Sequence, residues 1–169
     1  MLDEAAAAAE FLRGRTGAAR LGLVGLSMGG FNAARLAARD ASVEALVLWA
    51  AVASAENLIL AMTGAPSLEA VASTCPFDHH GNAVGVGFVR SAAGLFAPAE
   101  LRGWRGRALV VQGTADEEVP PSDAREYSAA LGDRAKLVLV EGASHTFNAI
   151  PHEGRVLSET VSFLREALG

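Results

Sequence analysis

Leu21-Gly22-Leu23-Val24-Gly25-Leu26-Ser27-Met28-Gly29-Gly30 is the stretch that decides the fold of this chain. A short apolar run ends at a serine flanked by glycines, and a helical pattern over residues 31–39 follows at once. This pattern predicts a strand, a sharp turn and a helix, with the hydroxyl of Ser27 at the tip of the turn. A turn this tight is expected to leave no room for side chains at Gly25 and Gly29. The helix behind Ser27 would direct free backbone N–H groups at negative charge that develops beside it.

The remaining sequence alternates strand and helix patterns on both sides of this turn. Strands are predicted at 20–26, 43–53, 107–113 and 136–140, because these runs are short and nearly continuously apolar. The helices between and around them are predicted over the following ranges: 5–12 (with Asp3 as a cap), 31–38, 120–131 and 152–168. This order predicts the α/β class, with a parallel sheet of about four strands and helices on both faces.

The segment 54–106 does not fit this alternation. It has no clear hydrophobic period, it is rich in glycine and proline, and only short helices are expected in it, near 56–62 and 69–73. We expect one domain over residues 1–169, with 54–106 as a small insertion or cap.

Composition restricts the class of protein. The chain has 169 residues, 51% of them hydrophobic and 20% charged, and a net charge of −5, which indicates a globular chain. No basic cluster stands out, so neither nucleic acid nor an anionic membrane surface is an expected partner. A single cysteine, Cys75, excludes an internal disulfide framework and is more plausible as a packed thiol than as a nucleophile. Asp3 and Glu4 stand where a secretory signal would be basic, and no run reaches roughly 18 apolar residues, so a cytoplasmic location is expected.

Polar residues follow three of the predicted strands, in the order Ser27, Asp116, His145. Functional residues of parallel sheets gather just past the carboxyl ends of the strands. A serine hydroxyl becomes a good nucleophile when an imidazole accepts its proton, and a carboxylate then orients that imidazole and stabilises its charged form. Asp123 is a rival for the acid. His79, His80 and His152 are rivals for the base, but only His145 directly follows a predicted strand.

Three motifs carry a resemblance to a known family: the Ser27 turn, Gly113-Thr114-Ala115-Asp116 with Val119-Pro120, and Gly142-Ala143-Ser144-His145-Thr146-Phe147. Together they resemble the serine hydrolases of the α/β-hydrolase fold, whose triad runs in the same order. Within that fold the chain looks closest to small carboxylesterases of the cinnamoyl/feruloyl-esterase and dienelactone-hydrolase-like groups. The backbone N–H of Met28 would then donate to the oxyanion.

The leading prediction is therefore a serine carboxylesterase that hydrolyses small or aromatic esters through an acyl-enzyme on Ser27, without a cofactor or metal. Alternatives are a hydrolase-like fragment or subunit with little activity alone, or a thioesterase, acyltransferase, lipase or peptidase with the same triad. Adjacent histidines at 79 and 80 beside Asp78 are not expected to bind a metal, because no further ligand group is near them in sequence.

The resemblance also implies strands that this sequence does not show. Family members have further strands before the one that carries the serine, and a loop after one of those strands supplies a second oxyanion donor. Nothing upstream of Leu21 can form them, so we expect a truncated or minimal hydrolase. The strand at 20–26 would then be an uncovered edge, through which a homodimer or another association would form.

Overall fold

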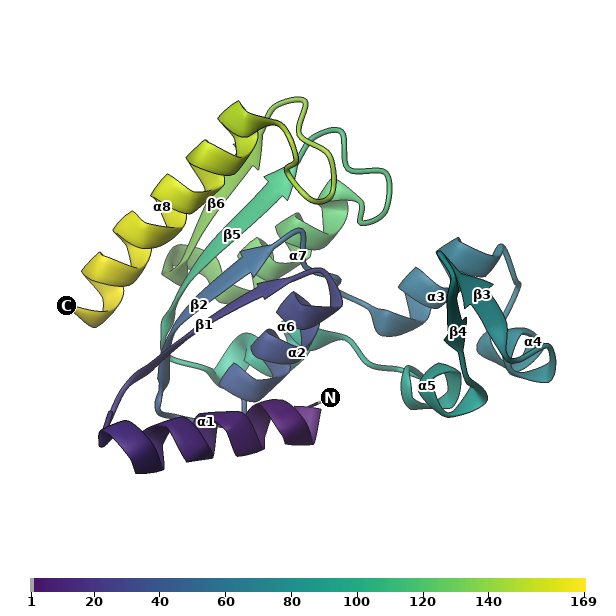
Figure 1. Ribbon diagram of the computed structural model, residues 1–169, viewed down its shortest axis with the longest axis horizontal. Helices are drawn as coiled ribbons and strands as arrows, with labels where there is room; N and C mark the ends of the chain where they lie inside the picture. The colour runs from purple at the N-terminus through teal and green to yellow at the C-terminus, as the bar shows by residue number, and fades with distance from the viewer. Residues whose placement is uncertain (1) are drawn as a thin grey trace. The chain divides into compact units, whose positions relative to one another are not determined.

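The computed structural model describes residues 2–169, and its centre is a parallel sheet of four strands. The strands are β1 (Leu21–Leu26), β2 (Val43–Trp49), β5 (Arg107–Gly113) and β6 (Ala135–Val140), in the spatial order β1-β2-β5-β6 (Figure 1). Each neighbouring pair is parallel. The predicted α/β class and sheet are confirmed, and all four strands lie where the apolar runs placed them.

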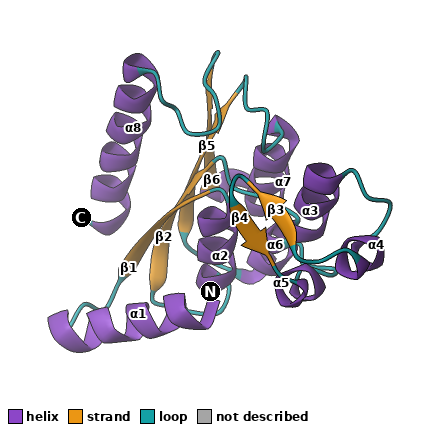
Figure 2. Ribbon diagram, turned by 45° about the vertical axis from the view of Figure 1, so that its right-hand side comes forward, coloured by secondary structure: helices purple, strands orange, loops and turns teal. Residues whose placement is uncertain are grey.

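Helices cover both faces of this sheet. The helices α2 (Met28–Ala37) and α7 (Pro121–Leu131) pack on one face, and α8 (Ile150–Leu168) packs on the other (Figure 2). The helix α1 (Leu2–Thr16) packs on α2 rather than on the strands. Strands covered on both faces cannot alternate polar and apolar side chains, which is why β2 and β5 read as continuous apolar runs.

The chain forms two compact units, which are described separately. The larger unit comprises the residues up to Ala53 together with Ala97–Gly169, and the smaller unit is Ser54–Phe96. The smaller unit contains α3 (Ala55–Thr63), α4 (Leu68–Ser73), a hairpin of β3 (Phe77–His79) and β4 (Asn82–Val84), and α5 (Val86–Ser91). The helices α3 and α4 match the two expected ones, whereas α5 and the hairpin had no clear signal in the sequence.

The smaller unit ends at Phe96, not at about residue 106 as the sequence suggested. The helix α6 (Ala97–Glu100) and the 3-10 turn η1 (Leu101–Gly103) belong to the larger unit. Ala97 and Leu101 are fully buried, and the Trp104 indole donates to the carbonyl of Val43 at 2.7 Å. The elements α6 and η1 pack on α2 and α7, and burial of their apolar side chains places this segment in the core, which its irregular pattern did not indicate.

Two element ends differ from the prediction for a local reason. The strand β2 stops at Trp49 instead of residue 53, because Ala50 has a φ of 44° and turns the chain out of the sheet while the next residues stay buried. Asp3 lies inside the first turn of α1 instead of capping it. The 168 residues described, 2–169, include no helix long and apolar enough to cross a membrane.

The strand β1 lies at the edge of the sheet formed by the described residues, as the sequence led us to expect. Two of its large apolar side chains are exposed: 48% of Val24 and 38% of Leu26. On α8, Leu157 and Val161 are also about half exposed, at 46% and 47%. The helix α8 also contacts β1, so exposed apolar side chains occur on two elements that touch at this edge of the sheet.

Candidate active site

Ser27 lies in a strained turn between β1 and α2. Its φ of 55° and ψ of −124° are outside the regions that residues other than glycine normally adopt. The backbone N–H of Ser27 donates to the carbonyl of Trp49 at 2.9 Å, and its carbonyl accepts from Phe31 N–H at 3.1 Å. The helix begins directly after the serine, at Met28, earlier than the apolar pattern suggested. The turn therefore has the geometry of a nucleophile elbow.

Close packing explains Gly25, one of the two glycines predicted to lie in a crowded turn, and it also explains Gly30. A Cβ at Gly25 would lie 2.5 Å from the carbonyl oxygen of Gly29, and a Cβ at Gly30 would lie 2.5 Å from the Cβ of Ala51. A Cβ at Gly29 would meet nothing within 4 Å, so the prediction for Gly29 was wrong. The crowded side of the turn is where β1, α2 and the residues after β2 meet, and Gly29 faces away from it.

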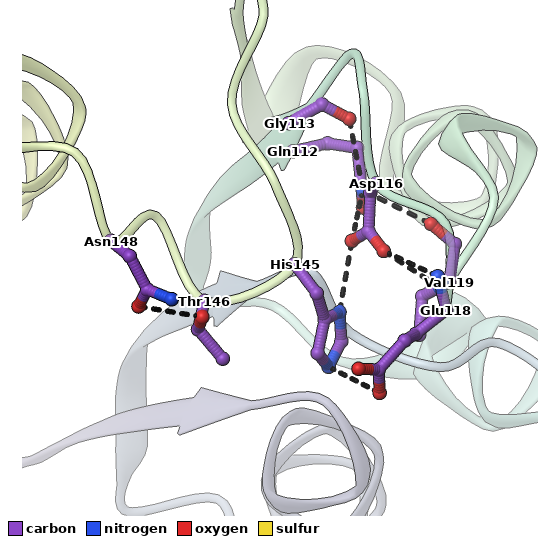
Figure 3. Close-up of polar contacts among 8 residues, drawn as sticks. All are labelled: Gln112, Gly113, Asp116, Glu118, Val119, His145, Thr146 and Asn148. Carbon is purple, nitrogen blue, oxygen red and sulfur yellow. Dashed lines mark hydrogen bonds and ion pairs between the residues drawn. The ribbon is translucent and has the colours of Figure 1, made fainter.

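Asp116 and His145 form a hydrogen-bonded pair. His145 Nδ1 lies 2.9 Å from Asp116 Oδ2, and both residues are 8% exposed (Figure 3). An ionised carboxylate can only accept, so Nδ1–H donates and the lone pair of the neutral ring is left on Nε2. The tautomer is therefore the one that a base facing a serine hydroxyl requires.

Asp116 is itself held by three more donors. Its Oδ1 accepts from the backbone N–H groups of Glu118 and Val119, each at 2.9 Å. Its Oδ2 also accepts from Gln112 Nε2 at 2.8 Å (Figure 3). Four hydrogen bonds to one carboxylate leave it a single orientation.

Gln112 is a residue that the sequence analysis missed. It is fully buried in β5, and its Nε2 also lies near the carbonyls of Gly113 and Val119, at 3.3 and 3.2 Å. All three recorded hydrogen bonds of this side chain are donated by Nε2, and Oε1 has no partner among residues 2–169, so the side chain serves as a donor. The available signal was an amide in an otherwise apolar strand, four residues before Asp116.

The rivals for the acid and the base lie elsewhere. Asp123 is in the first turn of α7, where its Oδ2 accepts from Ala53 N–H at 2.8 Å. Burial raises the pKa of Asp123, and the Ala53 hydrogen bond partly opposes this. His152 lies in the first turn of α8, and His79 and His80 lie at the hairpin of the smaller unit. None of these residues contacts the Asp116–His145 pair through a hydrogen bond or ion pair that the structure records.

Ser27 shares the carboxyl edge of the sheet with this pair. The four strands are parallel, so the turn after β1 and the loops after β5 and β6 all lie at the same edge. Three of the positive-φ residues outside glycine, Ser27, Ala50 and Phe147, follow β1, β2 and β6 at this edge. The structure joins Asp116 to His145 directly, whereas the Ser27 side chain makes no hydrogen bond within the described chain. Met28 N–H also has no acceptor among residues 2–169.

The chain is similar to known proteins in both its sequence and its fold. The family model of the prolyl oligopeptidase family matches residues 2–169. Among solved structures, the putative non-heme bromoperoxidase BpoC from Mycobacterium tuberculosis H37Rv is 19% identical with a TM-score of 0.71, and the match covers 100% of this chain and 74% of that one. The esterase domain of a Rhodothermus marinus protein is 16% identical with a TM-score of 0.75, covering 99% of this chain and 70% of that one.

A third similar structure is a puromycin-hydrolyzing peptidase from Mycobacterium tuberculosis. It is 22% identical with a TM-score of 0.71, and the match covers 99% of this chain but only 25% of the peptidase. No curated protein matches the sequence. These identities show the fold alone, whereas the family model spans nearly the whole chain. The resemblance to the α/β-hydrolase fold is thus confirmed, and the chain belongs to the prolyl oligopeptidase family, a family of hydrolases.

Proposed function

We propose that this hydrolase is a serine carboxylesterase that acts on small or aromatic esters through an acyl-enzyme on Ser27. The observation that carries the proposal is the 2.9 Å hydrogen bond from His145 Nδ1 to Asp116 Oδ2, at the same sheet edge as the strained Ser27 turn. That bond leaves Nε2 as the basic atom of the pair. The partly buried Ser27 at the same edge carries the hydroxyl whose proton such a base would take.

In this mechanism His145 Nε2 accepts the Ser27 proton while Oγ attacks the ester carbonyl. The orphan N–H of Met28, at the start of α2, donates to the oxyanion of the tetrahedral intermediate, and the helix dipole favours that charge. His145 then passes the proton to the leaving group, and the acyl group stays on Ser27. Water then attacks the acyl-enzyme while His145 accepts its proton, and the carboxylic acid is released from Ser27.

A peptidase is the second candidate, and the match to the prolyl oligopeptidase family favours it. An amide and an ester pass through the same acyl-enzyme, so the triad alone does not distinguish them. The leaving group does: an amide needs its nitrogen protonated by His145 before the C–N bond breaks, whereas an aryl oxide leaves more readily.

The proposal is tested with Ser27→Ala, and with Ser144→Ala as the matched control, because Ser144 is exposed and adjacent to His145. We expect Ser27→Ala to abolish hydrolysis of p-nitrophenyl butyrate and labelling by a fluorophosphonate, a loss of at least about 10³-fold. Ser144→Ala should retain both. Equal turnover by Ser27→Ala and the parent protein would refute the acyl-enzyme, and faster cleavage of peptide p-nitroanilides than of esters would favour the peptidase.

We also propose that the protein associates through β1, with a second copy as the simplest partner. The exposed Val24 and Leu26 on an edge strand support this, and so do the exposed Leu157 and Val161 on α8, which contacts β1. Light scattering should then give the mass of a dimer at micromolar concentration, and Val24→Lys should lower it to that of one chain. A monomer in both cases would contradict the proposal.

The alternative of a subunit with little activity alone predicts that Val24→Lys also loses fluorophosphonate labelling. The cytoplasmic location stays a prediction.

A further inference from the structure

The carboxylate of Glu118 lies beside the nitrogen of His145 that Asp116 does not bind. Glu118 Oε2 is 3.8 Å from His145 Nε2, on the opposite side of the ring from the Nδ1 hydrogen bond (Figure 3). The backbone of Glu118 is held at the site, because its N–H donates to Asp116 Oδ1 at 2.9 Å. Its side chain is 52% exposed, so the carboxylate borders both His145 and solvent.

Nε2 is the atom that exchanges a proton with the substrate in the proposed mechanism. A leaving group that receives this proton must come within about 3 Å of Nε2. With Glu118 Oε2 at 3.8 Å from the same atom, the first atoms of the leaving group lie at most about 7 Å from the carboxylate. A unit charge carried a few atoms further along the leaving group is still attracted or repelled by the carboxylate.

No cation in the surrounding loops neutralises this carboxylate. The loops after β5 and β6, residues 114–120 and 141–149, contain four acidic residues (Asp116, Glu117, Glu118 and Glu141) and neither lysine nor arginine. The segments after β1 and β2, residues 27–32 and 50–53, contain no charged residue at all. The field at Nε2 is therefore negative on the side from which a leaving group departs.

We propose that Glu118 selects substrates whose leaving group carries a positive charge, such as a cationic alcohol, thiol or amine, over substrates with an anionic leaving group. The inference rests on the proposed function, since it requires His145 to protonate the leaving group. Glu118 is a specificity residue in this scheme, and it takes no part in bond making. Because its side chain is half exposed, the preference is moderate and weakens with salt.

The test uses three thioesters with the same butyryl group and different leaving groups. Butyrylthiocholine has a cationic one, the thioester of 3-mercaptopropionate an anionic one, and the thioester of 2-mercaptoethanol a neutral one. The measured quantity is the ratio of kcat/KM for the cationic and the anionic substrate. Glu118→Gln should lower this ratio about 3- to 10-fold, and Glu118→Lys should lower it further. Glu117→Gln is the matched control, because Glu117 is the exposed neighbour without a contact to His145, and it should change the ratio less than about twofold.

The outcomes separate the two proposals. Raising the salt to about 0.5 M should lower the ratio of the parent protein and leave that of Glu118→Gln unchanged. Where turnover is slow, mass spectrometry follows how fast the Ser27 acyl-enzyme forms with each substrate in a single turnover. The acylation rates then give the same ratio. If Ser27 is acylated but the ratio is the same in the parent protein, Glu118→Gln and Glu117→Gln, the role of Glu118 is overturned and the proposed function stands. No acylation by any of the three thioesters would overturn the proposed function with it.

Discussion

Ser27 and the Asp116–His145 pair lie at the same edge of the sheet but are positioned by different means. Ser27 is placed by its backbone: a positive φ, three backbone hydrogen bonds, and glycines where β1, α2 and the residues after β2 crowd together. The pair is placed by side chains, with hydrogen bonds to Asp116 from Gln112, His145 and two backbone N–H groups. The serine therefore depends on local chain geometry, and the acid and base depend on a network.

This difference has a consequence for how each half can fail. A backbone-defined position tolerates no extra atom at its crowded contacts, because neither a strand nor a helix can move aside cheaply. A network loses one donor at a time, so its function declines in steps while the fold persists. Substitutions around Ser27 should therefore lower stability more than activity, whereas substitutions around the Asp116–His145 pair should lower activity more than stability.

The largest effect is expected at the glycines behind Ser27. Gly25→Ala and Gly30→Ala place a methyl group 2.5 Å from the Gly29 carbonyl oxygen and the Ala51 Cβ, respectively. Each should lower the free energy of unfolding by about 3 kcal/mol or more, because both sides of the contact are packed. Denaturant unfolding followed by circular dichroism measures this.

Gly29→Ala is the control for both variants. A Cβ there meets nothing within 4 Å, and the residue is in the first turn of α2. It should be neutral, or stabilise by up to about 1 kcal/mol through helix propensity. Equal stability of all three variants would mean that the crowding at Gly25 and Gly30 does not constrain the turn.

An intermediate effect, on activity, is expected at Gln112. Gln112→Met keeps the volume but removes the donor to Asp116 Oδ2. The carboxylate then has less to orient it, so kcat should fall about 10-fold with KM nearly unchanged. Thr160→Val is the matched control, since it also removes a side-chain hydrogen bond, the one from Trp49 Nε1 at 3.0 Å. Rates that fall equally in both variants would indicate a general loss of packing instead.

The smallest effect is expected at Asp123, and it depends on pH. Burial, the largest cause, raises the pKa of Asp123 in the folded protein above its ordinary value of 3.8. Ionisation therefore disfavours the folded state: the penalty is absent below 3.8 and develops as the pH rises through the raised pKa. Asp123→Asn removes the charge and keeps an acceptor for Ala53 N–H. Its unfolding free energy should exceed that of the parent protein at pH 7, by no more than roughly 0.5 kcal/mol.

The two proteins should converge in relative stability below pH 4, where the parent carboxyl is protonated. Thermal unfolding from pH 3 to pH 8 compares the two proteins. A parent protein that gains stability over Asp123→Asn with rising pH would show that the Ala53 hydrogen bond outweighs burial.

Local sequence patterns were enough to predict the order and type of the main elements and the candidates Ser27, Asp116 and His145. Apolar runs of strand length and amphipathic helical periods are local properties, so β1, β5, β6 and α7 could be read directly. The order of the three polar residues followed, because parallel strands place all their carboxyl ends at one edge. Their catalytic roles stay predictions.

Only the tertiary structure decided what touches these residues. Gly30, and not Gly29, meets the residues after β2, and no local pattern gives that contact. Gln112 reaches Asp116 because β5 and the loop after it fold back on one another, and Glu118 reaches His145 because two separate loops converge. Such contacts depend on how the folded elements lie in space, so neither hydrophobic periodicity nor composition predicts which residues come within contact distance. The physical reason is that a hydrophobic pattern specifies which face of an element is buried, whereas packing alone specifies its neighbour.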